Sequence, residues 1–304
     1  MKQIINYNAI KSKLEKNGLE IDNIRLLKDC LKNINYNLII GAFSSFFYIN
    51  PEKKKYDPVA SISQIIELYH FDSELAYKLL YYVLKIEKKL NTLIAYEIIN
   101  QYKLKDHCLL GINKNILCNK IFPNIKLINP PISYDNFIHL LTKYCSTNTS
   151  TKSYKNKKST NVINMWKELP LDLMCLSWSF STTFNVLIAL DDEVINKIVR
   201  NFDVDITTNS GFIDFIKNIL NIRNLISHNY VIFNSEVKYQ SSGLNYLYET
   251  IFNKHIEEMD LTKLIKMIEY FTDDDSLGKW IKTKLSKLNI KKKFKQKIIK
   301  LLAF

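Results

Sequence analysis

Turn-forming residues are scarce in this chain of 304 residues, which contains only six glycines and six prolines. The many short strands of a β-sandwich or β-barrel need more turns than these residues can supply. Cysteine is also scarce, with five residues in the chain. They lie far apart and form no Cys-x-x-Cys pair, and this spacing argues against a disulfide framework and a zinc site. We therefore expect an all-α protein with reduced thiols, no metal and no cofactor.

No basic segment followed by an apolar one opens the chain, so secretion is not expected. A long uncharged run, 173–190, contains several serines and threonines, which favours a buried core helix over a membrane span. We accordingly expect a cytoplasmic protein without integral membrane association. The hydrophobic fraction of 47% is large enough for an extensive core and excludes disorder of the whole chain.

Apolar residues recur at helical spacing along most of the chain. The longest predicted helix is 71–102, and residues 146–161 have no aliphatic side chain, which predicts a mobile loop. The same pattern predicts later helices over 169–190, 192–202, from 211 into the 220s, 244–270 and 279–303.

Arginine is the rarest charged residue, with three copies against forty lysines, and the net charge is +13. A basic excess of this size favours a polyanionic partner such as RNA or an anionic membrane surface. Much of the excess lies in residues 279–300, which hold ten lysines and no acidic residue. The candidate RNA-binding residues are Lys282, Lys284, Lys287, Lys291, Lys292, Lys293 and Lys295.

One of the rare arginines begins an Arg-Asn-x-x-x-His pattern formed by Arg223, Asn224 and His228. Histidine can transfer a proton near neutral pH, and arginine can hold phosphate oxygens, so the pattern suits RNA cleavage through the 2′-hydroxyl of the RNA. Arg223 also falls in an apolar helical stripe, where it needs a partner, and Glu87 is the candidate. The alternative interpretation is an arginine paired in the core and a histidine that caps a helix.

Five short elements in this order resemble the Abi-like family of abortive-infection proteins, of the AbiD/AbiF type, within the HEPN group of helical RNA-acting domains. The resemblance covers roughly residues 5–235. Its elements are Ile34-Asn35-Tyr36 with Phe46-Phe47, Tyr69-His70-Phe71-Asp72, Ile86-Glu87, Trp166 with Leu169-Pro170-Leu171-Asp172, and Arg223-Asn224 through His228 to Asn234.

The resemblance implies a HEPN-like helical bundle over residues 1–240, followed by a basic helical extension over 241–304. It also implies a metal-independent endoribonuclease that serves phage defence as a toxin, with Arg223, Asn224 and His228 as catalytic residues. Because the chain has one Arg-Asn-x-x-x-His copy, a composite site requires a homodimer. A small RNA antitoxin is a further partner that the resemblance implies.

Two other functions stay open. The chain can be a non-catalytic RNA-binding effector or sensor, or a helical interaction protein whose basic tail binds membranes. Tyr77, Tyr81 and Tyr82 allow two interpretations as well, because exposed tyrosines can stack on unpaired bases, whereas tyrosines at helical spacing usually belong to the core.

Overall fold

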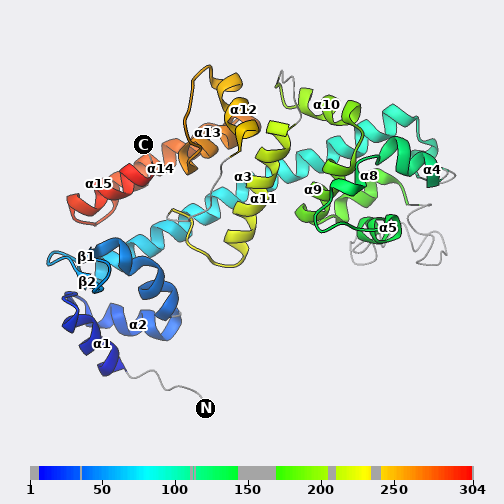
Figure 1. Cartoon of the computed structure of the whole chain (residues 1–304). Coiled ribbons are helices and arrows are strands. Elements are labelled where there is room, and N and C mark those ends of the chain that lie inside the picture. Colours follow the sequence, from blue (N-terminus) through cyan, green and yellow to red (C-terminus); the bar gives the residue numbers. More distant parts are fainter. Residues whose placement is uncertain are drawn as a thin grey trace, which may run out of the picture. The chain divides into compact units, whose positions relative to one another are not determined.

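The computed structural model describes residues 7–34, 36–109, 112, 114–142, 169–204, 210–233 and 241–302. Within these ranges helices dominate, and the only regular sheet is an antiparallel pair of short strands, β1 (Tyr48–Asn50) and β2 (Lys55–Tyr56) (Figure 1). The predicted all-α fold is confirmed. The expected loop at 146–161 lies outside the described residues. No helix among the described ones is long and apolar enough to cross a membrane.

The chain folds into two compact units. Unit 1 comprises Met1–Leu80, Leu225–Val237 and Asp260–Phe304, and unit 2 comprises Tyr81–Asn224 and Lys238–Met259. Two helices contribute residues to both units, namely α3 and α11. The expected domain boundary at residue 240 stays a prediction. The two compact units are not divided at a single point of the sequence, because unit 1 contains segments from both ends of the chain.

Unit 1 is built from helices of the N-terminal and C-terminal thirds of the chain. Two of these helices begin at a side-chain cap: Asn23 accepts a hydrogen bond from the Leu26 N–H, and Asp260 accepts one from the Lys263 N–H. The elements are α1 (Tyr7–Lys16), α2 (Ile24–Asn33), the π-helical turn η1 (Asn37–Gly41), the 3-10 turn η2 (Ser44–Phe47), the first part of α3 (Ile62–Tyr102), α13 (Leu261–Thr272), α14 (Ser276–Lys287) and α15 (Lys292–Leu301).

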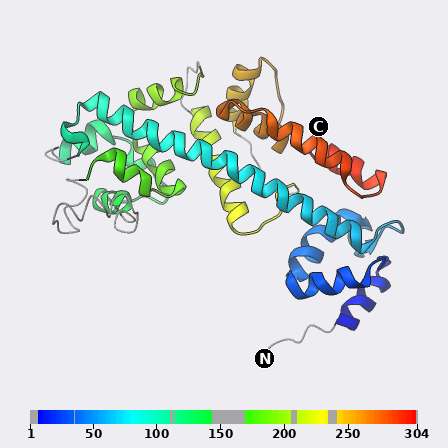
Figure 2. The same cartoon turned by 180° about the vertical axis from the view of Figure 1, so that it is seen from behind.

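The longest helix, α3, begins at Ile62, nine residues before the predicted start at 71 (Figure 2). The predicted start was wrong, although Ser61 directly before the helix and Gln64 three residues later form a capping-box sequence that marks this start. A distant part of the chain also contacts the helix end: the carboxylate of Asp22 accepts the backbone N–H of Ser63 at 3.1 Å and its hydroxyl at 3.0 Å.

The C-terminal part of the chain was predicted as two helices and forms four, of which α12 (Ser242–Phe252) belongs to unit 2. Asn253 and Asp273 follow α12 and α13 with φ angles of 47° and 50°, the left-handed conformation that ends a helix. Asparagine and aspartate adopt this conformation more readily than most residues. Asn253 thus interrupts the helix predicted over 244–270, and Asp273 ends α13 just beyond that range. The helix predicted over 279–303 is interrupted where α14 ends at Lys287 and α15 begins at Lys292.

The helices α14 and α15 are part of the core of unit 1. The ring of Phe294 is fully buried, with its centroid 4.7 Å from that of Phe47. Trp280 stacks on Phe71 of α3 at 6.5 Å. The lysines of both helices lie mostly on the exposed side, so the amphipathic pattern of the sequence reflects packing on one face and solvent on the other.

Unit 2 packs shorter helices with the second part of α3. The helix predicted over 169–190 is interrupted at Trp178, whose indole N–H donates to the carbonyl of Leu141, while Ser179 caps the next helix through the Thr182 N–H. The elements are η3 (Lys105–His107), α4 (Lys114–Ile116), η4 (Leu117–Ile121), η5 (Ile125–Leu127), α5 (Tyr134–Thr142), α8 (Leu171–Met174), η7 (Cys175–Ser177), α9 (Phe180–Ala189), α10 (Asp192–Arg200), most of α11 (Ser210–Ser227) and α12.

The packing of Phe294 predicts a measurable loss of stability. We expect Phe294→Ala to lower the free energy of unfolding by about 3–5 kcal/mol, because it removes a buried ring and leaves a cavity. The matched control is Ile49→Ala, whose side chain is 59% exposed and whose removal should cost less than about 0.5 kcal/mol. Urea denaturation measures both. Equal effects of the two substitutions would show that α15 is not part of the core.

Candidate functional site

The C-terminal end of α11 places His228 at a defined backbone position. Asn229 has a left-handed φ of 55°, and the N–H groups of Asn229 and Tyr230 donate to the carbonyls of Ile226 and Leu225 at 3.1 and 3.0 Å. This pair of hydrogen bonds is the Schellman arrangement, in which His228 is the C-cap residue. The side chain of His228 is exposed to solvent. Its imidazole is therefore accessible to a ligand.

Asp72 of α3 fixes the segment that follows this helix end. Its buried carboxylate accepts the backbone N–H of Ile232 at 3.0 Å and that of Phe233 at 2.8 Å. The ring of Phe233 stacks on Phe43 with centroids 5.9 Å apart. Burial raises the pKa of Asp72 to about 6, and the two N–H donors lower it only in part. The chain around His228 is thus fixed on both sides, by the helix end and by Asp72.

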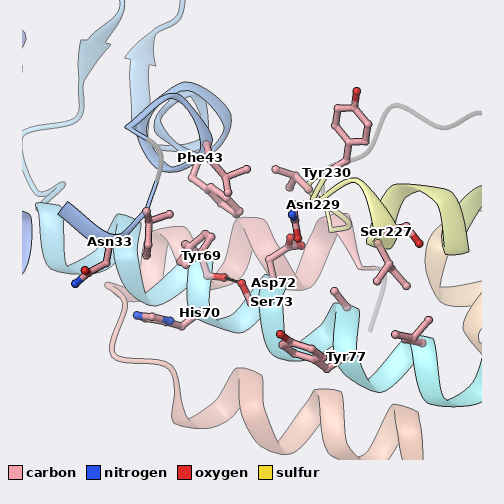
Figure 3. A pocket seen from close by; sticks show the side chains of 16 residues that line it. Asn33, Phe43, Tyr69, His70, Asp72, Ser73, Tyr77, Ser227, Asn229 and Tyr230 are labelled. Carbon is pink, nitrogen blue, oxygen red and sulfur yellow. Dashed lines mark hydrogen bonds between the residues drawn. The ribbon is translucent and has the colours of Figure 1, made fainter. Parts of the chain in front are cut away.

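A cleft of about 620 Å³ opens in unit 1 beside this segment (Figure 3). One wall is a stripe of α3 side chains at a spacing of three or four residues, and another is the end of α11 with the residues that follow it. None of the described residues that line the cleft is a lysine or an arginine. Its lining residues are Asn33, Ile34, Leu38, Phe43, Tyr69, His70, Asp72, Ser73, Ala76, Tyr77, Leu80, Ile226, Ser227, Asn229, Tyr230 and Val231.

Arg223 and Asn224 belong to unit 2, where both are half-buried. Burial raises the pKa of Glu87, and the positive charge of Arg223 lowers it in part. An electrostatic interaction between these two side chains is what the sequence leads us to expect for an arginine in an apolar stripe. His228 belongs to unit 1, so the Arg-Asn-x-x-x-His pattern begins in unit 2 and ends in unit 1.

The lysines proposed to bind RNA have unequal surroundings in unit 1. Lys284 forms an ion pair with Glu74 at 2.6 Å, Lys293 pairs with Asp57, and Lys295 donates to the carbonyl of Ser286 at 2.9 Å. The remaining candidates are exposed; they are Lys282, Lys287, Lys291 and Lys292. The last two lie at the start of α15, where positive charge is unfavourable next to the helix dipole. A bound anion would relieve this repulsion.

One residue of the cleft, Asp72, was not predicted as a functional residue from the sequence. Asp72 was quoted only as part of an element of the resemblance, although a carboxylate inside the apolar stripe of a helix is a signal that it has buried donors. Tyr77 and Tyr81 are 76% and 55% exposed, whereas Tyr82 is 3% exposed. The core interpretation is therefore wrong for the first two and confirmed for the third.

Metal-binding clusters are absent from the residues that the structure describes, since no group of three or more histidine, cysteine, aspartate or glutamate side chains is placed to hold an ion. Four cysteines within these residues are free thiols, and Cys145 lies outside them. Among the residues of the resemblance, Asn35, Trp166 and Asn234 also lie outside.

Comparison with known proteins gives one match. The family model described as Abi-like protein matches residues 29–234, a range that contains Asp72, Glu87 and the whole Arg-Asn-x-x-x-His pattern. Neither the curated proteins nor the solved structures contain a match. The helices α12, α13, α14 and α15 lie beyond the matched range.

The buried carboxylate of Asp72 predicts a distinct dependence of stability on pH. Its pKa is about 6 in the folded chain and near the ordinary 3.8 in the unfolded chain, so the folded state binds the proton more tightly. The stability that this proton provides is complete below about pH 4 and is lost as the pH rises through 6. For the two pKa units involved, the loss is about 3 kcal/mol.

Asp72→Asn tests this dependence, because the amide oxygen can still accept the backbone N–H groups but does not titrate. Between pH 4 and 7, we expect the wild type to lose about 3 kcal/mol of stability relative to the variant. Asp57→Asn is the control of opposite sign. The hydrogen bond from Lys293 lowers the pKa of Asp57, so the stability that the Asp57 carboxylate provides is lost as the pH falls. A parallel course of wild type and Asp72→Asn would contradict the assignment.

Proposed function

We propose that this chain, which belongs to the Abi-like protein family, serves abortive infection by cleaving RNA in the cytoplasm. Family membership indicates the role in abortive infection, and the RNA-directed activity is our inference. The observation that supports it most directly is the exposed imidazole of His228 at a helix end that backbone hydrogen bonds define. We further assign the chain to the AbiD/AbiF type and to the HEPN group.

The proposed reaction uses the RNA's own nucleophile. The 2′-oxygen attacks the adjacent phosphorus, the bond from phosphorus to the 5′-oxygen breaks, and the products are a 2′,3′-cyclic phosphate and a 5′-hydroxyl. His228 accepts the proton of the 2′-hydroxyl. Arg223 stabilises the negative charge that develops on the phosphate oxygens, and Asn224 positions the reacting groups. No metal ion takes part in this scheme.

A homodimer completes the scheme. Each chain has one His228, and the reaction needs one group to accept a proton and another to return a proton to the 5′-oxygen. Two protomers that bring their Arg-Asn-x-x-x-His segments together provide both groups. A small RNA that occupies the same surface would keep the toxin inactive, which makes it the antitoxin that we propose.

One observation favours a second function, a non-catalytic RNA-binding effector or sensor. The interaction between Arg223 and Glu87 gives the arginine a structural role that needs no substrate. In that case the Arg-Asn-x-x-x-His pattern stabilises the fold, and lysines and tyrosines bind RNA. A membrane-binding tail has less support, because the apolar side chains of α14 and α15 that would enter a bilayer are buried in unit 1.

The catalytic proposal predicts cleavage without divalent cations. Purified wild type should cut total cellular RNA in EDTA and leave 2′,3′-cyclic phosphate ends, and His228→Ala should lower the rate by at least about 100-fold, because it removes the acid-base group. The control is His255→Ala, another exposed histidine, which should cleave like the wild type. RNA that stays intact but co-purifies equally with wild type and His228→Ala would support the sensor instead.

The basic helices predict a specific loss of salt dependence. A triple variant in which Lys287, Lys291 and Lys292 are changed to Gln tests this. We expect the slope of the logarithm of the RNA-binding constant against the logarithm of the salt concentration to fall in magnitude by about 2, because each phosphate contact on a single strand contributes about 0.7. Lys53, Lys54 and Lys55 changed to Gln make the same change of charge on another exposed segment. Equal slopes for the two triple variants would contradict a local RNA contact on α14 and α15.

A further inference from the structure

The cleft in unit 1 has the composition of a site for an uncharged aromatic ligand. Among the described residues that line it there is no lysine or arginine, in a chain that contains 43 of them. A phosphate-binding site in such a basic protein would be expected to use some of them. Side chains that can donate or accept hydrogen bonds are present instead: Asn33, His70, Ser73 and Asn229.

Exposed tyrosines supply the second part of the argument. Tyr77 on α3 is 76% exposed and Tyr230 after α11 is 63% exposed, and both belong to the residues that line the cleft. In Figure 3 the ring of Tyr230 points away from the other labelled side chains, toward the outside of the cleft. Tyr81 and Tyr96 of α3 are exposed as well, so the argument depends on the position of exposed aromatic rings at the cleft and not on their exposure alone. Aromatic faces together with hydrogen-bonding groups are what proteins use to hold unpaired bases.

The location connects the cleft with the proposed chemistry. Ser227 and Asn229 line the cleft, and they flank His228 in the chain. The volume of about 620 Å³ falls in the range of small-molecule sites and has room for a base with its ribose. A nucleotide whose base occupies this cleft would have its sugar and phosphate near the end of α11.

We propose that the cleft binds one unpaired nucleobase of the RNA, through stacking on Tyr77 or Tyr230 and hydrogen bonds from the polar lining. This inference rests on the proposed function, because it takes RNA as the ligand. A base bound in this cleft fixes which phosphate of the RNA strand lies next to His228. The identity of that base would therefore set the RNA sequence that the protein prefers.

The proposed base site and the basic helix α14 lie against different faces of α3. The cleft stripe contains Tyr69, Ser73 and Tyr77, whereas Phe71 and Lys78 contact Trp280 of α14, with the Lys78 ammonium 5.9 Å from the ring centroid. At 100° per residue the two stripes are centred roughly 150° apart on the helix. Substitutions in the cleft should therefore change base binding without a change in the salt dependence that α14 and α15 produce.

Uncharged nucleosides test the site directly, because they have a base and a ribose but no phosphate. Saturation-transfer NMR with adenosine, guanosine, cytidine and uridine measures their binding to the full-length wild type, Tyr77→Ala, Tyr230→Ala and Tyr77→Phe. We expect at least one nucleoside to bind, about tenfold more weakly to one or both alanine variants. Tyr77→Phe should keep the affinity, and higher salt should leave it unchanged.

Tyr96→Ala is the matched control, since Tyr96 lies on the same helix, is 58% exposed and does not line the cleft. Binding of no nucleoside, or equal binding to wild type and both alanine variants, would overturn the base site. RNA cleavage that depends on His228 without nucleoside binding would leave the proposed function intact and remove this inference. Nucleoside binding through the tyrosines without cleavage would support the site and contradict the ribonuclease.

Discussion

The carboxylate of Asp72 joins parts of unit 1 that lie 160 residues apart in the chain. A buried carboxylate is costly unless donors surround it, and the N–H groups of Ile232 and Phe233 provide those donors. Because this segment follows α11 directly, the same contact determines where the chain runs after His228. The walls of the cleft depend on it as well, since α3 and the residues after α11 form them.

Helix α3 gives unit 1 its organisation because its two sides have different partners. One stripe of side chains lines the cleft, and a stripe that includes Phe71 packs against Trp280 of α14. The basic C-terminal helices therefore belong to the fold, and their lysines are the exposed side of packed helices. Removal of these helices would uncover Phe47 and Phe71, so charge substitutions test their role in RNA binding more cleanly than truncation does.

Much of the architecture could be predicted because it depends on local patterns. Scarce glycine and proline with apolar residues at helical spacing predict helices, and α10 and α11 lie close to their predicted positions. Helix starts and breaks were harder. The start of α3 has a local signal in Ser61 and Gln64, which the predicted range did not include. Trp178, by contrast, interrupts a predicted helix through a bond to Leu141, and a contact of this kind leaves no signal in a short window of sequence.

The sequence by itself determined the helical class, the family elements and the Arg-Asn-x-x-x-His pattern, because composition and residue order contain them. Helical phase also separates the tyrosines of α3: Tyr82 falls in the apolar stripe of Leu75, Leu79 and Ile86 and is buried, whereas Tyr77 and Tyr81 fall roughly on the opposite side and are exposed. Only the tertiary structure decided the cleft, because its walls come from segments that are distant in the sequence and meet only after packing.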